Sequence, residues 1–224
     1  NNIAGVYRDQ GDYDKALEWL GKALAIREKV LGTEHPRTAN TYNSIAGVYR
    51  DQGDYDKALE WLGKALAIRE KVLGKEHPNT AAIYCNLAIM YHAQDDYDKA
   101  LEWHGKALEI FEKVLGTEHP DTAVTYSNIA AVYHAQGDYD KALEWHGKAL
   151  AIFEKVLGTE HPDTAVTNNN IAAVYRDQGD YDKALELCDK ALAIMEKVLG
   201  KEHPHTTTTY NNIARIRTAQ GNAE

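Results

Sequence analysis

The sequence repeats itself every 42 residues, and this period constrains the fold more than any other feature of the chain. Residues 80–121 and 122–163 differ at only 8 of 42 positions, so the chain is an array of one structural unit. The landmarks that return at this interval are Trp19, Trp61, Trp103 and Trp145, then Pro36, Pro78, Pro120, Pro162 and Pro204, and finally Gly11, Gly53, Gly137 and Gly179, with Asp95 in place of one glycine.

Each unit encodes two helices, as the reference unit 122–163 shows. Residues 122–136 place apolar or aromatic side chains at the three-to-four spacing of one helical face. Pro120 precedes this first helix, and Gly137 can adopt the left-handed conformation that ends it. Asp138 can then cap a second helix of about 18 residues, which Gly158 ends. The apolar positions of the first helix are Tyr126, Ile129, Ala130 and Tyr133.

A period near 42 also occurs in armadillo, HEAT and WD40 repeats. Long Ala/Leu/Glu/Lys-rich segments exclude the short strands of a WD40 propeller. Large, small and aromatic positions on the first helix, followed by Gly137, Tyr139, Ala142 and Ala149, resemble the tetratricopeptide repeat. That repeat usually has 34 residues and a proline directly after its second helix, whereas Glu154 occupies this place here and the proline comes eight residues later.

The recurrent sequence ALAIxEKVLGxEHPxTA resembles the 42-residue units of kinesin light chains and nephrocystin-like proteins. It is also similar to the carboxy-terminal repeats of fungal and bacterial NACHT or NB-ARC signalling proteins of the STAND class. The resemblance implies an all-α fold, a right-handed superhelical solenoid of antiparallel helix pairs that spans residues 1–224 as a single domain. The expected repeats are 1–37 (partial), 38–79, 80–121, 122–163, 164–205 and 206–224 (partial).

The frame of the repeat places Asn1 inside a first helix, so we expect a fragment of a longer array. A solenoid end without a polar capping surface exposes apolar side chains. We therefore expect the first repeat to expose apolar surface and to associate end to end, which a monomeric mass at high protein concentration would contradict.

Charge and composition argue against several partners. The net charge is −9, which opposes nonspecific attraction to nucleic acid or to an anionic membrane. No apolar run approaches the roughly 20 residues of a membrane helix. Cys85 and Cys188 are too few for a disulfide framework, and no secretory signal is visible, so we expect a cytoplasmic protein.

No set of residues points to catalysis, a metal or a cofactor. Five of the ten histidines recur once per unit in Glu-His-Pro segments, and stacked repeats would hold them roughly 10 Å apart, whereas zinc ligands lie near 2 Å from one ion. We interpret them as helix-start and loop-packing residues. His104 and His146 replace Leu20 and Leu62, which favours a structural role inside the protein. We expect a protein that is not an enzyme.

Resemblance to tetratricopeptide arrays implies a concave groove lined by first-helix positions, which in the reference unit are Val124, Ser127, Ala131, His134 and Ala135. These positions vary between units, whereas the segment Asp-Tyr-Asp-Lys-Ala-Leu-Glu does not. Variation is also what any exposed position shows, so this alternative stays open. The residues that we expect to line the binding groove are Arg8, Asn40, Asn43, Arg50, His92, Ser127, His134, Asn169, Arg176 and Asn211.

An aspartate follows each of Arg8, Arg50 and Arg176 and can partly neutralise it, whereas His92 and His134 lack that neighbour. We expect the groove to bind a protein or an extended or helical peptide, with acidic and aromatic anchors as the likeness to kinesin light chains implies. The high identity between repeats favours the ligand-sensing repeats of a larger signalling protein, and the alternatives are a kinesin-light-chain-like cargo adaptor and a self-associating spacer.

One recurrent feature has two interpretations. A glycine inside the second helix costs roughly 0.8 to 1 kcal/mol relative to alanine. Either another helix or another chain approaches these positions closely, or they are tolerated surface glycines. The positions are Gly21, Gly63, Gly105 and Gly147.

Overall fold

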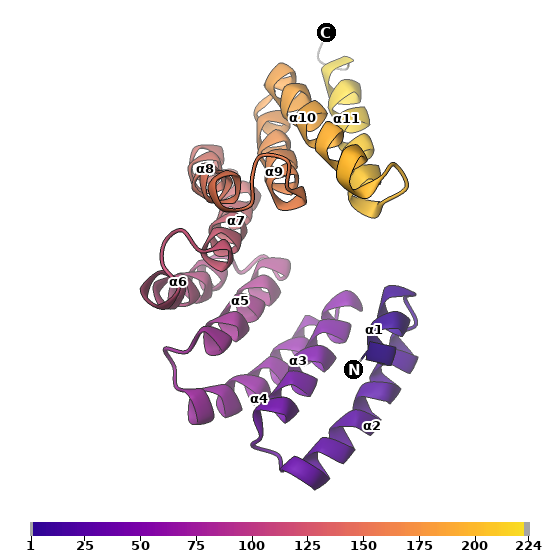
Figure 1. The fold of residues 1–224 in the computed structure, drawn as a ribbon, viewed down its shortest axis with the longest axis vertical. Coiled ribbons are helices and arrows are strands. Elements are labelled where there is room, and N and C mark those ends of the chain that lie inside the picture. The colour runs from indigo at the N-terminus through magenta and orange to yellow at the C-terminus, as the bar shows by residue number, and fades with distance from the viewer. Residues whose placement is uncertain (1, 222–224) are drawn as a thin grey trace. The chain divides into compact units, whose positions relative to one another are not determined.

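The computed structural model describes residues 2–221, which form eleven α-helices and no β-strand (Figure 1). Short turns join consecutive helices, which pack against each other within each repeat. The predicted all-α class and its antiparallel helix pairs are therefore confirmed. Asn1 lies outside the described residues. The helices are α1 (Asn2–Asp9), α2 (Tyr13–Leu31), α3 (Pro36–Asp51), α4 (Tyr55–Leu73), α5 (Pro78–Ala93), α6 (Tyr97–Val114), α7 (Pro120–Ala135), α8 (Tyr139–Val156), α9 (Pro162–Gln178), α10 (Tyr181–Leu199) and α11 (Pro204–Gly221).

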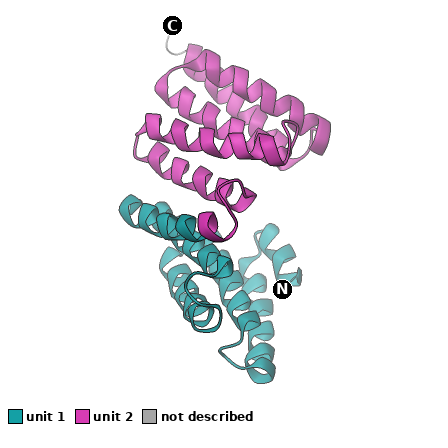
Figure 2. Cartoon of the chain, turned by 60° about the vertical axis from the view of Figure 1, so that its left-hand side comes forward, with its two compact units in different colours: residues 1–110 teal, residues 111–224 magenta. Residues whose placement is uncertain are grey.

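The chain divides into two compact units, Asn1–Ile110 and Phe111–Glu224, with the boundary inside α6 (Figure 2). In the first unit α2 packs against α3, and α4 packs against α3 and α5. In the second unit α8 packs against α7 and α9, and α10 packs against α9 and α11. The extension of one solenoid over residues 1–224 stays a prediction.

The Glu-His-Pro histidines begin the first helix of each repeat. The Nδ1 atom of His119 accepts a hydrogen bond from the backbone N–H of Asp121 at 3.1 Å, and His35, His77 and His161 cap their helices in the same way. This satisfies one of the free N–H groups at the helix start. The interpretation of these histidines as helix-start residues is confirmed. The helix begins at Pro120, two residues before the expected Thr122, because His119 supplies the cap.

The turns between paired helices depend on residues that tolerate a positive φ. Gly137 ends α7 with φ +79°, and Asp138 then caps α8 by accepting from the backbone N–H of Lys141 at 3.2 Å. Asp95, which replaces the glycine in one repeat, also has a positive φ of 58°. Aspartate is one of the few side chains that enter this region readily. The substitution therefore keeps the turn.

The space around the second-helix glycines decides between their two interpretations. A Cβ atom added to any of them would have nothing within 4 Å, and all four are exposed. Close approach of another helix of the described chain is therefore wrong as an explanation, and they are surface glycines. The positions are Gly21, Gly63, Gly105 and Gly147.

Candidate functional site

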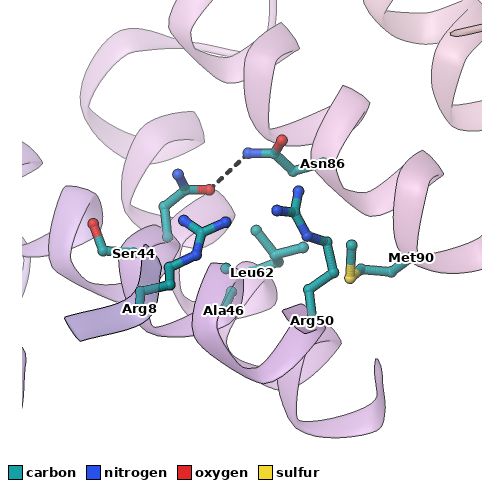
Figure 3. A pocket seen from close by; sticks show the side chains of 9 residues that line it. Arg8, Ser44, Ala46, Arg50, Leu62, Asn86 and Met90 are labelled. Atoms are coloured by element: carbon teal, nitrogen blue, oxygen red, sulfur yellow. Dashed lines mark hydrogen bonds between the residues drawn. The ribbon is translucent and has the colours of Figure 1, made fainter. Parts of the chain in front are cut away.

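A pocket of about 170 Å³ lies in the first unit, where side chains of α1, α3, α4 and α5 meet (Figure 3). The first helices of three successive repeats contribute most of its lining, as a groove built from first-helix positions requires. Three of the predicted groove residues, Arg8, Asn43 and Arg50, come together here. The full lining is Arg8, Asn43, Ser44, Ala46, Gly47, Arg50, Leu62, Asn86 and Met90.

Two guanidinium groups share one carboxylate at the edge of this pocket. Arg8 pairs through Nε with Asp51 of the following repeat, and Arg50 Nη2 lies 2.9 Å from the same aspartate. Burial would raise the pKa of Asp51, but hydrogen bonds from Arg8 and Arg50 outweigh it and hold that pKa below its ordinary value. Two cations and one anion leave one positive charge in excess, and each guanidinium keeps further N–H donors for a ligand.

Gly47 allows Arg8 to lie close to α3. A Cβ atom at this position would meet Arg8 Nη1 at 3.2 Å, tighter than ordinary van der Waals contact. Of the equivalent positions in the second unit, two carry alanine, Ala131 and Ala173, and the third carries Arg215. Because Gly47 has no side chain, the guanidinium group of Arg8 can lie against the backbone of α3 beside the pocket.

The rest of the pocket combines amides with an apolar floor. Asn86 Nδ2 donates to Asn43 Oδ1 at 2.8 Å, which fixes the two amides relative to each other. Leu62 and Met90 are almost fully buried and present carbon and sulfur to the pocket. In Figure 3 Leu62 lies between the side chains of Arg8 and Arg50. The pocket therefore offers cationic donors above an apolar surface.

Two predicted residues of the first unit do not line this pocket. Asn40 instead accepts a hydrogen bond from Arg69 of α4. The His92 ring packs against Tyr97, with 5.8 Å between ring centroids, and burial lowers the pKa of His92 although Asp95 opposes the shift. His92 is thus a half-buried, helix-packing histidine.

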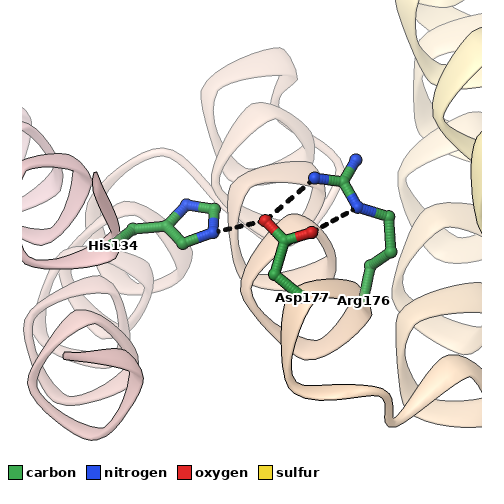
Figure 4. Close-up of polar contacts among 3 residues, drawn as sticks. All are labelled: His134, Arg176 and Asp177. Carbon is green, nitrogen blue, oxygen red and sulfur yellow. Dashed lines mark hydrogen bonds and ion pairs between the residues drawn. The ribbon is translucent and has the colours of Figure 1, made fainter. Parts of the chain in front are cut away.

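The second unit contains a related cluster on α7 and α9 (Figure 4). His134 Nε2 lies 2.8 Å from Asp177 Oδ2, while Arg176 donates through Nε to Asp177 Oδ1 at 2.7 Å and through Nη2 to Oδ2 at 3.0 Å. As expected, no aspartate follows His134 in sequence, yet the structure pairs this histidine with one. Its partner comes from the next repeat, 43 residues along the chain, where comparison of adjacent residues could not find it.

The other three predicted residues of the second unit have separate environments. Asn169 is buried and donates through Nδ2 to Thr209 Oγ1 at 2.7 Å. The hydroxyl oxygen of Ser127 and Oδ1 of Asn169 are buried without a hydrogen-bond partner in the described part of the chain. Asn211 is exposed on α11. These three residues are therefore not brought together with the cluster of His134, Asp177 and Arg176.

Asn86 and Met90 were not among the residues predicted from sequence. Asn86 belongs to a repeat position that is polar in every unit, although it lies one residue from the apolar face of the first helix. A position that is polar in every unit beside an apolar face could therefore have identified Asn86 from the sequence. Met90 was hidden because its repeat position is valine or isoleucine in the other units and is buried from Val48 onward, as a core position would be. The polar position reads Asn2, Ser44, Asn86, Asn128, Asn170 and Asn212.

His104 lies on α6 and His146 on α8, and they are only 1% and 2% exposed. Burial, with a smaller contribution from His92 and His134 respectively, lowers the pKa of each to about 4. Both are therefore neutral near pH 7. In the described residues no group of three or more histidine, cysteine or acidic side chains could hold a metal ion.

No helix within residues 2–221 is long and apolar enough to cross a membrane. A family model of the tetratricopeptide repeat matches the sequence in overlapping segments, residues 1–71, 38–113, 80–155, 121–171 and 163–224. None of the curated proteins matches the sequence.

Solved structures resemble the chain over most of its length. BtubC (BKLC) from P. vanneervenii is 31% identical with a TM-score of 0.73, over 90% of this chain and 80% of that one. A variant of a protein from Podosopora anserina, described as a kinesin light chain with nearly identical TPR-like repeats, is 31% identical with a TM-score of 0.70, over 88% of this chain and 92% of that one. Aspartyl phosphate phosphatase F from Bacillus subtilis shares the fold, at 17% identity and a TM-score of 0.77, over 97% of this chain and 56% of that one.

Proposed function

The chain belongs to the tetratricopeptide repeat family, and from this premise we propose that it is a non-enzymatic scaffold whose helix-lined pocket binds an acidic segment of a protein or peptide. Repeats of this family bind protein partners. The single observation that carries the proposal is the pairing of Arg8 and Arg50 around Asp51 above the Leu62 and Met90 floor. We further propose that the protein works in the cytoplasm.

The pocket chemistry supports a carboxylate as the anchoring group. Guanidinium groups match the planar, bidentate geometry of a carboxylate better than an ammonium group does. The excess positive charge at Arg8, Asp51 and Arg50 attracts an anion, while the acidic remainder of the chain disfavours nucleic acid. An aspartate or glutamate side chain of the ligand therefore fits beside the arginines.

The apolar floor supports an aromatic or aliphatic neighbour in the ligand. A volume of about 170 Å³ is smaller than the roughly 300 to 1,000 Å³ of pockets that hold drug-sized molecules. It suits one side chain of a peptide. Methionine sulfur makes favourable contacts with aromatic rings, so Met90 favours an aromatic residue.

The lining supports binding over catalysis. Ser44 is its only hydroxyl side chain, and the lining contains no histidine, lysine or carboxylate that could activate it. Asp51, at the edge, is held by two arginines as a paired carboxylate.

Among the roles within this class, the likeness to a kinesin light chain array and to BtubC favours a kinesin-light-chain-like adaptor. The role of ligand-sensing repeats in a larger signalling protein stays a prediction, which the domains encoded beside this array would decide. End-to-end association also stays a prediction. It is supported by the side chains of Ile3 and Val6, which are 52% and 56% exposed on α1.

Selection from a random peptide-display library tests the proposed function. The library is panned against the wild-type chain, the Arg8→Gln, Arg50→Gln variant and the Arg37→Gln variant, in which an exposed arginine outside the pocket is replaced. We expect an acidic, aromatic motif to be enriched by the wild type and by Arg37→Gln, and to be lost with the double variant. Equal enrichment of the motif by all three proteins, or no enrichment at all, would overturn the proposal.

A further inference from the structure

The same three-residue arrangement occurs in both units. In each, one aspartate of a first helix is shared between the arginine that precedes it and a residue 43 positions earlier. In the first unit the shared aspartate is Asp51, between Arg8 and Arg50. In the second unit it is Asp177, between His134 and Arg176. Only one member differs in kind, since histidine replaces arginine.

This replacement changes how the charge of the cluster depends on pH. Arginine is charged at every physiological pH, so the cluster in the first unit always has one positive charge in excess. Burial would raise the pKa of Asp177, but hydrogen bonds from Arg176 and His134 outweigh it and keep that pKa below its ordinary value. The negative charge of Asp177 and the positive charge of Arg176 therefore cancel near neutral pH. An excess positive charge arises only when the imidazole of His134 is protonated.

His134 is surrounded by charged and titratable groups from two neighbouring helices. From α9 it faces Asp177 and Arg176, and from α8 it faces Tyr139, whose ring centroid lies 5.8 Å away, and His146. The side chain of Asp177 raises the pKa of Arg176, which stays charged. Burial lowers the pKa of His146 to about 4, so this histidine stays neutral in the same range.

We propose that His134, Asp177 and Arg176 form a second site for an acidic peptide, which binds only when His134 carries a proton. This inference rests on the proposed function of the first-unit pocket. The ligand carboxylate takes hydrogen bonds from the protonated imidazole and from Arg176, both of which are partly exposed. The protein thus binds acidic segments through Arg8 and Arg50 at any physiological pH and gains a second attachment point on mild acidification.

The test measures binding of a short fluorescein-labelled peptide of alternating glutamate and tryptophan by fluorescence anisotropy at about pH 8 and about pH 6. The Arg8→Gln, Arg50→Gln variant isolates the second site. Three further substitutions are made on it: His134→Gln, His134→Arg, and His205→Gln as a control that replaces an exposed histidine on α11. Circular dichroism at both pH values verifies that each variant is folded.

We expect the double variant to bind the peptide about tenfold more tightly at the lower pH. His134→Gln abolishes this gain, His134→Arg gives the tighter binding at both pH values, and His205→Gln leaves the gain intact. A double variant whose affinity is independent of pH, or a gain that survives His134→Gln, would overturn the inference.

Peptide binding by the wild type distinguishes a failure of the second site from a failure of the proposed function. If the wild type binds the peptide at about pH 8 through Arg8 and Arg50 but shows no gain at about pH 6, only the second site is wrong. If the wild type binds the peptide at neither pH, the acidic ligand class is wrong, and the second site fails with it.

Discussion

At the scale of single residues, one position of the second helix changes from leucine to histidine along the chain. The first two repeats place Leu20 and Leu62 there, and the next two place His104 and His146, all of them nearly fully buried. Nδ1 of both histidines lacks a hydrogen-bond partner in the described part of the chain. A buried imidazole without such partners can hold a proton only at a cost in free energy.

We therefore predict that the folded chain loses stability as pH falls from about 6.5 to about 4. In the folded state burial lowers the pKa of His104 and His146 to about 4, whereas unfolded imidazole titrates near its ordinary 6.5. The unfolded state thus binds more protons across this window, and stability falls by about 1.4 kcal/mol per pH unit for each histidine. Thermal denaturation followed by circular dichroism at a series of pH values measures the loss.

The variant His104→Leu, His146→Leu should flatten this pH dependence, since leucine already fits the equivalent position in two repeats. His205→Leu, an exposed control, should leave it as in the wild type. If the double leucine variant is as sensitive to acid as the wild type, the two buried histidines are not the cause.

At the scale of helices, the second helices of four repeats contain a glycine that packing does not require. Gly63 lies inside α4 with open space where a Cβ atom would be, whereas Gly53 precedes α4 with φ +77°. The first glycine costs the helix backbone entropy, and the second allows a conformation that alanine avoids.

We predict opposite effects of alanine at these two glycines. Gly63→Ala should raise the free energy of unfolding by about 0.8 to 1 kcal/mol, because alanine favours the helix and meets no neighbour. Gly53→Ala should lower it by about 1 to 2 kcal/mol, because alanine is strained at positive φ. Urea denaturation measures both. A loss of stability in Gly63→Ala would show that an interaction absent from this structure needs the glycine.

At the scale of the whole molecule, the period, the all-α fold and the helix starts and ends could be predicted from sequence, because caps, prolines and glycines act locally and recur in every unit. The family match and the solved structures confirm the tetratricopeptide-type solenoid. The first-unit pocket was predicted in part. Arg8, Asn43 and Arg50 were found because the resemblance to tetratricopeptide arrays implies a groove at their first-helix positions, whereas Asn86 and Met90 lie outside those positions.

Contacts between repeats account for what the sequence analysis missed. The partner of Arg8 is Asp51 and not the adjacent Asp9, and the partner of His134 is Asp177. These pairs depend on how far successive first helices are displaced, which is a property of tertiary packing. A comparison of neighbouring residues along one helix cannot supply that displacement.

The central claim is that the arginine pair of the first unit binds acidic peptides, and an exchange of charges tests it most directly. The affinities of the glutamate and tryptophan peptide and of a matching lysine and tryptophan peptide are measured for the wild type and for Arg8→Glu, Arg50→Glu, with Arg37→Glu as the control. We predict that the wild type and Arg37→Glu prefer the acidic peptide, and that the double variant prefers the basic one. An unchanged preference for the acidic peptide in the double variant would contradict the assignment of this pocket as the binding site.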